Sequence, residues 1–111
     1  MKGLPLEDFL MPGENVRYRS PAPVEYQGSI YNFCITDRRL IWYRRTGLIF
    51  KSDEVIAENI GDVEGIKYQE KGMIKKKGII QITTTRKKLE FSGPKEAMRA
   101  VYAELQAYMG K

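Results

Sequence analysis

The 111-residue sequence contains no histidine and a single cysteine, Cys34. Without histidine, the chain lacks the usual general base, the usual zinc ligand and the side chain that changes charge near neutral pH. One cysteine excludes an intramolecular disulfide. Because Cys34 lies in an apolar run and no histidine can activate it, we expect a small buried residue instead of a reactive thiol.

Motifs that carry catalysis are also missing. The sequence has no G-x-S-x-G elbow, no glycine-rich phosphate loop and no pair of cysteines. Its carboxylates, such as those of Asp53 and Glu54, are dispersed in the way that is typical of surface charge. We therefore expect a protein that is not an enzyme and that holds no metal ion and no other cofactor.

Long apolar runs are absent too. No run approaches the roughly 20 apolar residues that cross a bilayer as a helix, and the acidic residues near the start do not suit a signal peptide. We expect a cytoplasmic protein, with attachment to a membrane surface as the alternative. Nineteen Lys and Arg against fourteen Asp and Glu give a net charge of +5, which favours acidic surfaces, anionic lipid or nucleic acid as partners.

The most informative stretch that is present runs from Tyr31 to Arg45. Two β-rich segments meet there at a short polar link, in which the Asp37 side chain can bond to backbone just ahead of it, and this pattern predicts a hairpin. A two-residue loop places four large apolar side chains on one face of the pair. These four are Phe33, Ile35, Leu40 and Trp42. Cys34 and Ile41 fall on the other face.

Further strands are predicted by short alternating segments bounded by glycine, proline or asparagine. Together with the hairpin, they cover residues 14–20, 24–36, 39–45, 48–57, 63–71, 79–84 and 88–92. Gly28 is a candidate bulge or bend within the second strand. Residues 59–62 form a corner, and residues 72–78 form a hairpin tip whose lysines, 75 to 77, are expected to be solvated.

Helical patterns occur at the two ends of the chain. Residues 1–13 form an N-terminal segment in which one short helix places Leu6, Phe9 and Leu10 on the body. Near the C-terminus, with Pro94 at the first helical position, one face is apolar at helical spacing. That face comprises Met98, Val101, Tyr102, Leu105, Tyr108 and Met109. The expected fold of residues 14–111 is mainly β (α+β): about seven antiparallel strands in two packed sheets, capped by a C-terminal amphipathic helix. A five-stranded OB-fold fits less well.

The order of these elements resembles the bacterial and archaeal pleckstrin-homology-like (PH-like) domains. The likeness covers nearly the whole chain from residue 10 onward. Its motifs are Met11-Pro-Gly-Glu14, Ile35-Thr-Asp-Arg-Arg-Leu-Ile41, Thr46-Gly-Leu48, Val55-Ile56 with Ile60 and Asp62-Val63, and Phe91-Ser-Gly93 before the helix. The resemblance implies a PH-like barrel in which the loops after the first, third and sixth strands gather at one open end.

By that resemblance, the open end presents a cluster of cations suited to phosphate. Its members are Arg19, Arg44, Arg45, Arg86 and Lys87. Leu48, Ile49 and Phe50 lie just beyond and supply a possible apolar contact with lipid. Eukaryotic lipid-binding relatives carry a basic signature across their first hairpin, which is incomplete here because Glu25-Tyr-Gln27 occupies its second half.

The resemblance implies a binding or assembly module. Our first expectation for its partner is another protein or a second copy of the chain, because open sheet edges can accept a strand. An anionic membrane or phospholipid, bound by the basic loop end, is the second. Nucleic acid is the third, because aromatic and basic residues alternate in Arg17-Tyr-Arg19 and in residues 42–45.

Overall fold

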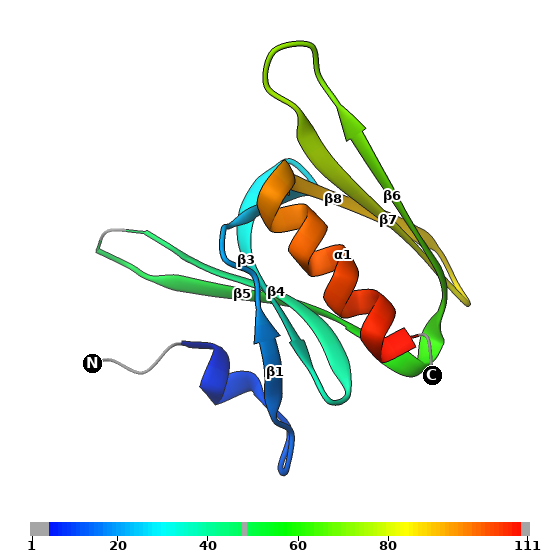
Figure 1. Cartoon of the computed structure of the whole chain (residues 1–111). Helices are drawn as coiled ribbons and strands as arrows, with labels where there is room; N and C mark the ends of the chain where they lie inside the picture. Colours follow the sequence, from blue (N-terminus) through cyan, green and yellow to red (C-terminus); the bar gives the residue numbers. More distant parts are fainter. Residues whose placement is uncertain (1–4, 48, 110–111) are drawn as a thin grey trace.

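A computed structural model describes residues 5–47 and 49–109. In chain order its elements are η1 (Pro5–Phe9), β1 (Val16–Arg19), β2 (Val24–Tyr26), β3 (Ser29–Thr36), β4 (Arg39–Thr46), β5 (Ser52–Asn59), η2 (Ile60–Asp62), β6 (Val63–Lys71), β7 (Lys77–Thr84), β8 (Lys88–Pro94) and α1 (Lys95–Met109). The strands pair in the order β5-β4-β3-β2-β8-β7-β6, and β1 pairs with β3. Figure 1 shows α1 lying across the front of this strongly bent sheet.

The predicted register of the central hairpin is confirmed. Phe33 lies opposite Trp42, and Ile35 lies opposite Leu40. The turn itself is organised by Thr36, whose hydroxyl accepts the backbone N–H of Arg38 at 3.0 Å and of Arg39 at 2.8 Å. The side chain of Asp37, expected to bond to backbone just ahead, instead accepts the backbone N–H of Asn15 at 3.0 Å.

Residues 24–36 do not form the single strand that the sequence predicted. They form two strands, β2 and β3, joined by a tight turn at Gln27 and Gly28, with Tyr26 paired to Ser29. Both turn residues have positive φ angles, 54° and 79°, as the two-residue turns that match strand twist require. Gly28 is therefore a turn residue and not a bulge. The expected antiparallel architecture with a C-terminal helix is confirmed, with eight strands instead of about seven.

Aromatic side chains dominate the main core. The Trp42 ring stacks on Tyr26 with centroids 4.8 Å apart and meets the Phe91 ring edge-on at 5.3 Å. Phe33 lies 4.9 Å from Phe91. The helix covers this cluster with three fully buried side chains, Met98, Val101 and Leu105. It begins at Lys95, one residue later than expected, because Pro94 ends β8. Within residues 5–47 and 49–109, no helix has the length and low polarity needed to cross a membrane.

A second, smaller cluster lies on the other face of β3 and β4. Leu6 from η1 is completely buried there against Cys34, Ile41 and Tyr43. The short helix therefore packs on the sheet, although Phe9 remains 41% exposed. Burial raises the pKa of the Cys34 thiol to about 11, which keeps this cysteine in its unreactive neutral form.

A buried carboxylate fastens the N-terminal segment to the central hairpin. The Glu14 carboxylate accepts hydrogen bonds from the Thr36 hydroxyl at 2.6 Å and from the Met11 backbone N–H at 2.8 Å. It also accepts two from the Arg39 guanidinium, one from Nε at 2.9 Å and one from Nη2 at 2.7 Å. Arg39 also donates to the Phe9 carbonyl at 3.0 Å. The motif residues Glu14, Thr36 and Arg39 thus have a structural role, because they satisfy one another's polar groups inside the protein.

Gly78 permits the close approach of α1 to β7, and its replacement by alanine is expected to lower the free energy of unfolding by about 1–3 kcal/mol. A Cβ atom at this position would lie 2.5 Å from Met98 Cβ and 2.8 Å from the Tyr68 hydroxyl. Chemical denaturation would measure the effect. Gly65→Ala on β6 is the matched control, because its Cβ would meet nothing within 4 Å. Equal losses in the two variants would contradict the close packing at Gly78.

Candidate binding surfaces

The predicted cations Arg44 and Arg45 lie near the end of β4, and each is paired with an acidic residue of β5. Arg44 Nε lies 2.7 Å from Glu54, and Arg45 reaches both carboxylate oxygens of Asp53 at 2.7 and 3.1 Å. These hydrogen bonds lower the pKa of both carboxyl groups. Successive strand residues point to opposite faces, and the Arg44 guanidinium accordingly lies over the Tyr31 ring, 5.2 Å from its centroid. The two arginines therefore form two separate, neutralised pairs.

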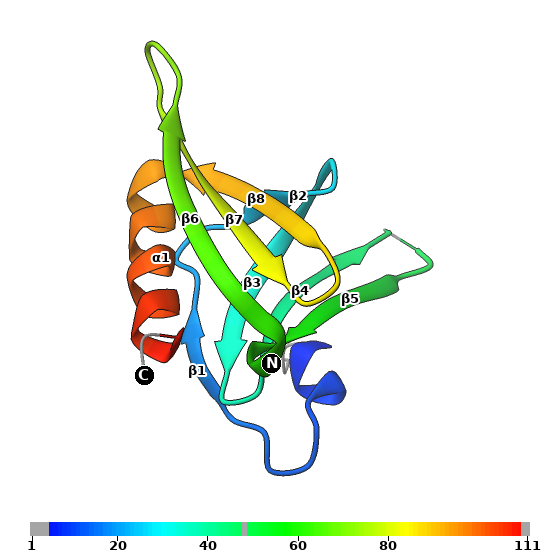
Figure 2. The ribbon, with the colours of Figure 1, turned by 90° about the vertical axis from the view of Figure 1, so that its right-hand side faces the viewer.

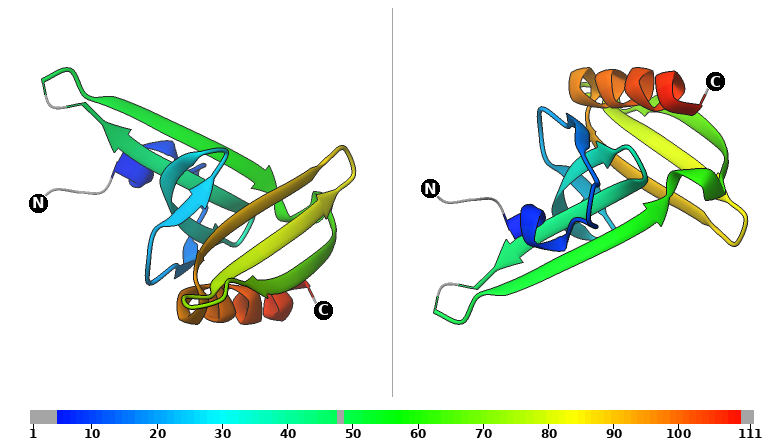
Figure 3. Two further views of the ribbon diagram at one scale, coloured as in Figure 1. Left: turned by 90° about the horizontal axis from the view of Figure 1, so that it is seen from above. Right: turned by 90° about the horizontal axis from the view of Figure 1, so that it is seen from below.

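Arg86 and Lys87 occupy the turn between β7 and β8. Lys87 Nζ lies 2.7 Å from Glu58, and Arg86 lies 4.0 Å from Asp62. Figures 1 and 3 show the β7–β8 turn and the free end of the β4–β5 hairpin on opposite sides of the molecule. The structure therefore does not bring these two cations together with Arg44 and Arg45.

Arg19 is the fifth predicted cation, and it contacts β4 at Tyr43, the residue before Arg44. It lies at the end of β1, opposite Cys34 of β3, and donates from Nη1 to the Tyr43 hydroxyl at 3.2 Å. Arg19 was predicted to lie next to the first loop of the open end. In the structure, the first tight turn after β1 is instead Gln27-Gly28, which is separated from Arg19 by Ser20–Pro23 and the whole of β2.

The predicted apolar contact lies at the end of the β4–β5 hairpin. Ile49 is 84% exposed and Phe50 is 88% exposed. Leu48, the third residue of that prediction, lies outside the described residues. We call Ile49 and Phe50 the β4–β5 tip. Their exposure leaves two large apolar side chains directed into solvent.

A second apolar tip was not predicted from the sequence. Met73 is 99% exposed and Ile74 is 96% exposed, at the end of the β6–β7 hairpin, which projects beyond the rest of the fold (Figures 1 and 2). We call this pair the β6–β7 tip. The sequence does contain a signal for this tip. Two apolar residues between Gly72 and the lysines are unexpected in a hairpin end that needs only to be soluble.

Lysines flank the β6–β7 tip on both sides. Lys71 precedes it, and residues 75 to 77 follow it. Lys77 lies 3.3 Å from Glu25 of β2. Among the residues that the structure describes, no carboxylate lies within 4.0 Å of the amino groups of Lys71, Lys75 or Lys76. These three charges are therefore available to an external anion, unlike those of Arg44, Arg45 and Lys87, each of which has a carboxylate at 2.7 Å.

A groove of about 600 Å³ opens at the base of the β6–β7 tip. Its walls come from β2, the start of β3, the end of β8, the start of α1 and the hairpin itself. Four lysines line it, at positions 75, 76, 77 and 95, against two glutamates, at positions 25 and 96. Ile30 and Ile74 add apolar surface. We call this the basal groove, and its lining combines positive charge with apolar side chains.

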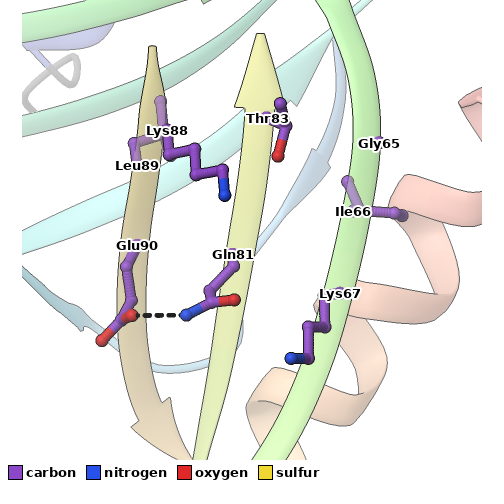
Figure 4. A pocket seen from close by; sticks show the side chains of 8 residues that line it. All are labelled: Gly65, Ile66, Lys67, Gln81, Thr83, Lys88, Leu89 and Glu90. Carbon is purple, nitrogen blue, oxygen red and sulfur yellow. Dashed lines mark hydrogen bonds between the residues drawn. The ribbon is translucent and has the colours of Figure 1, made fainter.

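A different depression, of about 490 Å³, lies on the outer face of β6, β7 and β8. Figure 4 shows Lys67, Gln81, Lys88 and Glu90 around it, with Gln81 Nε2 donating to Glu90 at 2.9 Å. Polar side chains from three adjacent strands cover this face, and the apolar residues in its lining are the half-buried Ile66 and the buried Leu89. Its two lysines provide a useful comparison with those of the basal groove.

The architecture is similar to that of a solved bacterial domain. The crystal structure of a pleckstrin homology domain from Shewanella amazonensis SB2B superposes with a TM-score of 0.68 at 13% sequence identity, over 96% of this chain and 93% of that chain. No protein-family model and no curated protein sequence matches the chain. At this identity, the similarity establishes the fold alone. The chain therefore has a PH-like fold.

Proposed function

We propose that the protein is a non-enzymatic binding module that docks onto anionic membrane surfaces through its β6–β7 tip. The observation that carries the proposal is the nearly complete exposure of Met73 and Ile74. Beside them lie Lys71, Lys75 and Lys76, whose amino groups have no carboxylate within 4.0 Å in the described part of the chain. Transfer of apolar surface out of water is favourable by about 25 cal/mol per Å². Each lysine near an anionic leaflet adds about 1 kcal/mol of attraction. Together, these contributions suit a lipid interface.

The position of the β4–β5 tip favours a partner with a flat surface, such as a membrane. In Figure 1, the two hairpins extend from the body in different directions, and no other element projects beyond the line that joins their ends. A flat surface can therefore touch Ile49 and Phe50 together with the β6–β7 tip. The small binding pocket of a partner protein would reach only one of them.

Co-sedimentation with vesicles tests the proposal. The protein is expected to bind vesicles that contain phosphatidylserine, to bind neutral phosphatidylcholine vesicles weakly, and to lose affinity as salt screens the lysines. Met73→Ser/Ile74→Ser should lower the affinity at least about tenfold, because both apolar contacts are lost. Phe9→Ser/Met11→Ser removes two partly exposed apolar side chains from the N-terminal segment and serves as the control. Wild-type binding in the tip variant, or no binding of the wild type, would overturn the proposal.

A protein partner or a second copy of the chain is the other candidate function. It is favoured by the order of the sheet, in which β5 and β6 are the two ends and each has a strand neighbour on one side only among the described residues. An unpaired edge can accept a strand from another chain. Sedimentation equilibrium over a range of protein concentrations would test for a second copy. A dimer that persists in Met73→Ser/Ile74→Ser would support edge pairing over association through the tip.

A further inference from the structure

The basal groove is concave, whereas the two apolar tips project from the body of the protein (Figures 1 and 2). Three separate parts of the chain line it: the β2–β3 hairpin, residues 74–77 of the β6–β7 hairpin, and residues 92–96 where β8 meets α1. A flat bilayer meets projecting tips first. A groove instead encloses a partner that projects toward it, such as a segment of polypeptide chain.

The charges of the groove are not balanced within the protein. Four lysines against two glutamates leave its lining with a net charge of +2. Lys77 pairs with Glu25 at 3.3 Å. In the described part of the chain, no carboxylate lies within 4.0 Å of the other three amino groups, those of Lys75, Lys76 and Lys95. An acidic segment would supply the carboxylates that these lysines lack.

Exposed apolar side chains lie beside these charges. Ile30 of β3 is 59% exposed and Ile74 of the hairpin is 96% exposed, and both line the groove. Pro23 and Pro94 add further apolar surface to the lining. Removing such surface from water favours binding. A ligand that carried only negative charge would leave this surface in water, so the groove fits a ligand with large apolar groups among its carboxylates.

We infer that the basal groove binds an acidic segment of a partner protein, one that carries large apolar side chains among its carboxylates. The inference goes beyond membrane docking and does not depend on it. The carboxylates pair with the unpaired lysines, and an apolar side chain packs on Ile30 and Ile74. Elsewhere, Arg44, Arg45 and Lys87 each have a carboxylate at 2.7 Å, which an incoming acidic residue would have to displace.

Amide NMR spectra of the whole chain test the assignment with a glutamate-rich peptide that contains leucines. The peptide should move the signals of groove residues, namely Ile30, Lys77, Gly93 and Lys95. Two matched peptides, with glutamine in place of glutamate or serine in place of leucine, should each bind about fivefold more weakly or less, because one kind of contact is lost. Shifts elsewhere, no shifts, or equal binding by either matched peptide would overturn the inference.

Paired lysine variants locate the binding of the same peptide. Lys76→Ala/Lys95→Ala should weaken it about fivefold or more, because two exposed ion pairs are lost. Lys67→Ala/Lys88→Ala removes the same charge from the outer face of β6 to β8 (Figure 4) and should change the affinity less than about twofold, because salt screens distant charges. Equal losses in the two variants would show attraction by general charge and overturn the groove site.

Two single variants separate this site from membrane docking. Ile30→Ser alters the groove and neither tip, so it should weaken peptide binding about threefold and leave vesicle binding unchanged. Phe50→Ala alters the β4–β5 tip and not the groove, so it should weaken vesicle binding alone. Unchanged peptide binding in Ile30→Ser would overturn the inference even if vesicles bind. Peptide binding at the groove by a protein that binds no vesicles would support it and reject the docking proposal.

A soluble lipid is the alternative ligand for the same lysines. Dihexanoyl phosphatidylserine, below its micelle concentration, should move the groove signals less than the peptide does at equal concentration, because a single headgroup offers fewer carboxylates and apolar contacts than the peptide. Larger shifts with the lipid would assign the groove to lipid and overturn the inference.

Discussion

Replacing Glu14 by alanine is expected to lower the free energy of unfolding by about 3–5 kcal/mol, as the loss of one partner of a buried ion pair typically does. The Glu14 side chain has no exposed surface, and that of Arg39 is 14% exposed. The substitution leaves the guanidinium, the Thr36 hydroxyl and the Met11 N–H without their shared acceptor. Urea unfolding at neutral pH would measure the loss.

Glu64→Ala is the control for this variant. Glu64 is exposed on β6, so its removal should change stability by no more than about 0.5 kcal/mol. The double variant Glu14→Ala/Arg39→Ala should lose less than the sum of the single losses, because the two residues stabilise each other. A loss below about 1 kcal/mol in Glu14→Ala would contradict the role of this carboxylate.

The same carboxylate makes stability depend on pH. Hydrogen bonding by Arg39, opposed by burial, lowers the pKa of Glu14 from 4.5 to about 2. Because the folded pKa is below the unfolded one, the contribution is fully present above pH 4.5 and is lost as the pH falls toward 2. Wild-type stability should therefore fall more steeply across this range than that of Glu14→Gln, measured by urea unfolding at each pH. An equal dependence of stability on pH in the wild type and in Glu14→Gln would contradict the lowered pKa of Glu14.

Phe91→Ala is the second substitution with a large expected effect, a loss of about 3–5 kcal/mol. The Phe91 ring is buried and lies within 5.3 Å of Trp42 and 4.9 Å of Phe33. Its removal leaves a cavity in the aromatic core beneath α1. Thermal and urea unfolding, with the fluorescence of Trp42 as a local probe, would measure the destabilisation.

Phe50→Ala is the matched control, in which vesicle binding and not stability is expected to change. The same atoms are removed, but from a ring that is almost fully exposed at the β4–β5 tip. Stability should change by no more than about 0.5 kcal/mol, while affinity for anionic vesicles should fall several-fold through the loss of buried apolar surface. Destabilisation by Phe50→Ala comparable to that of Phe91→Ala would contradict the assignment of Phe50 to the surface.

The central hairpin was predictable because its two faces carry different side chains. Only one register places Phe33, Ile35, Leu40 and Trp42 together, and a slip by one residue would expose half of them. The predicted pairing is therefore the observed one. The final helix was predictable for a similar reason, since its buried residues recur at helical spacing.

The split of residues 24–36 was not predictable from the same kind of pattern. The turn depends on Gln27 adopting a positive φ of 54°, a conformation for which glutamine carries no sequence signal. Without that turn, the first loop of the barrel was assigned to Pro21–Pro23. This displaced assignment brought Arg19 into the predicted cluster.

The pairing of the predicted cations was hidden for another reason. Asp53 and Glu54 looked like dispersed surface charge, but the β4–β5 register sets them directly opposite Arg45 and Arg44. The sequence predicted a strand over residues 48–57, whereas β5 covers Ser52–Asn59, so this register did not follow from the prediction. The cations themselves could be read from the sequence. Which of them are paired with a carboxylate could not, because that depends on the strand register.

Nitroxide labels at the two tips would test the membrane docking most directly. Phe50→Cys, Ile74→Cys and, on the outer sheet face, Lys67→Cys would each be labelled, because the native Cys34 is fully buried and its pKa is raised to about 11. With phosphatidylserine vesicles, both tip labels should become more accessible to oxygen than to a water-soluble nickel complex, while the label at position 67 stays in water. Tip labels that remain in water on vesicle-bound protein, or immersion of position 67, would contradict the proposed docking.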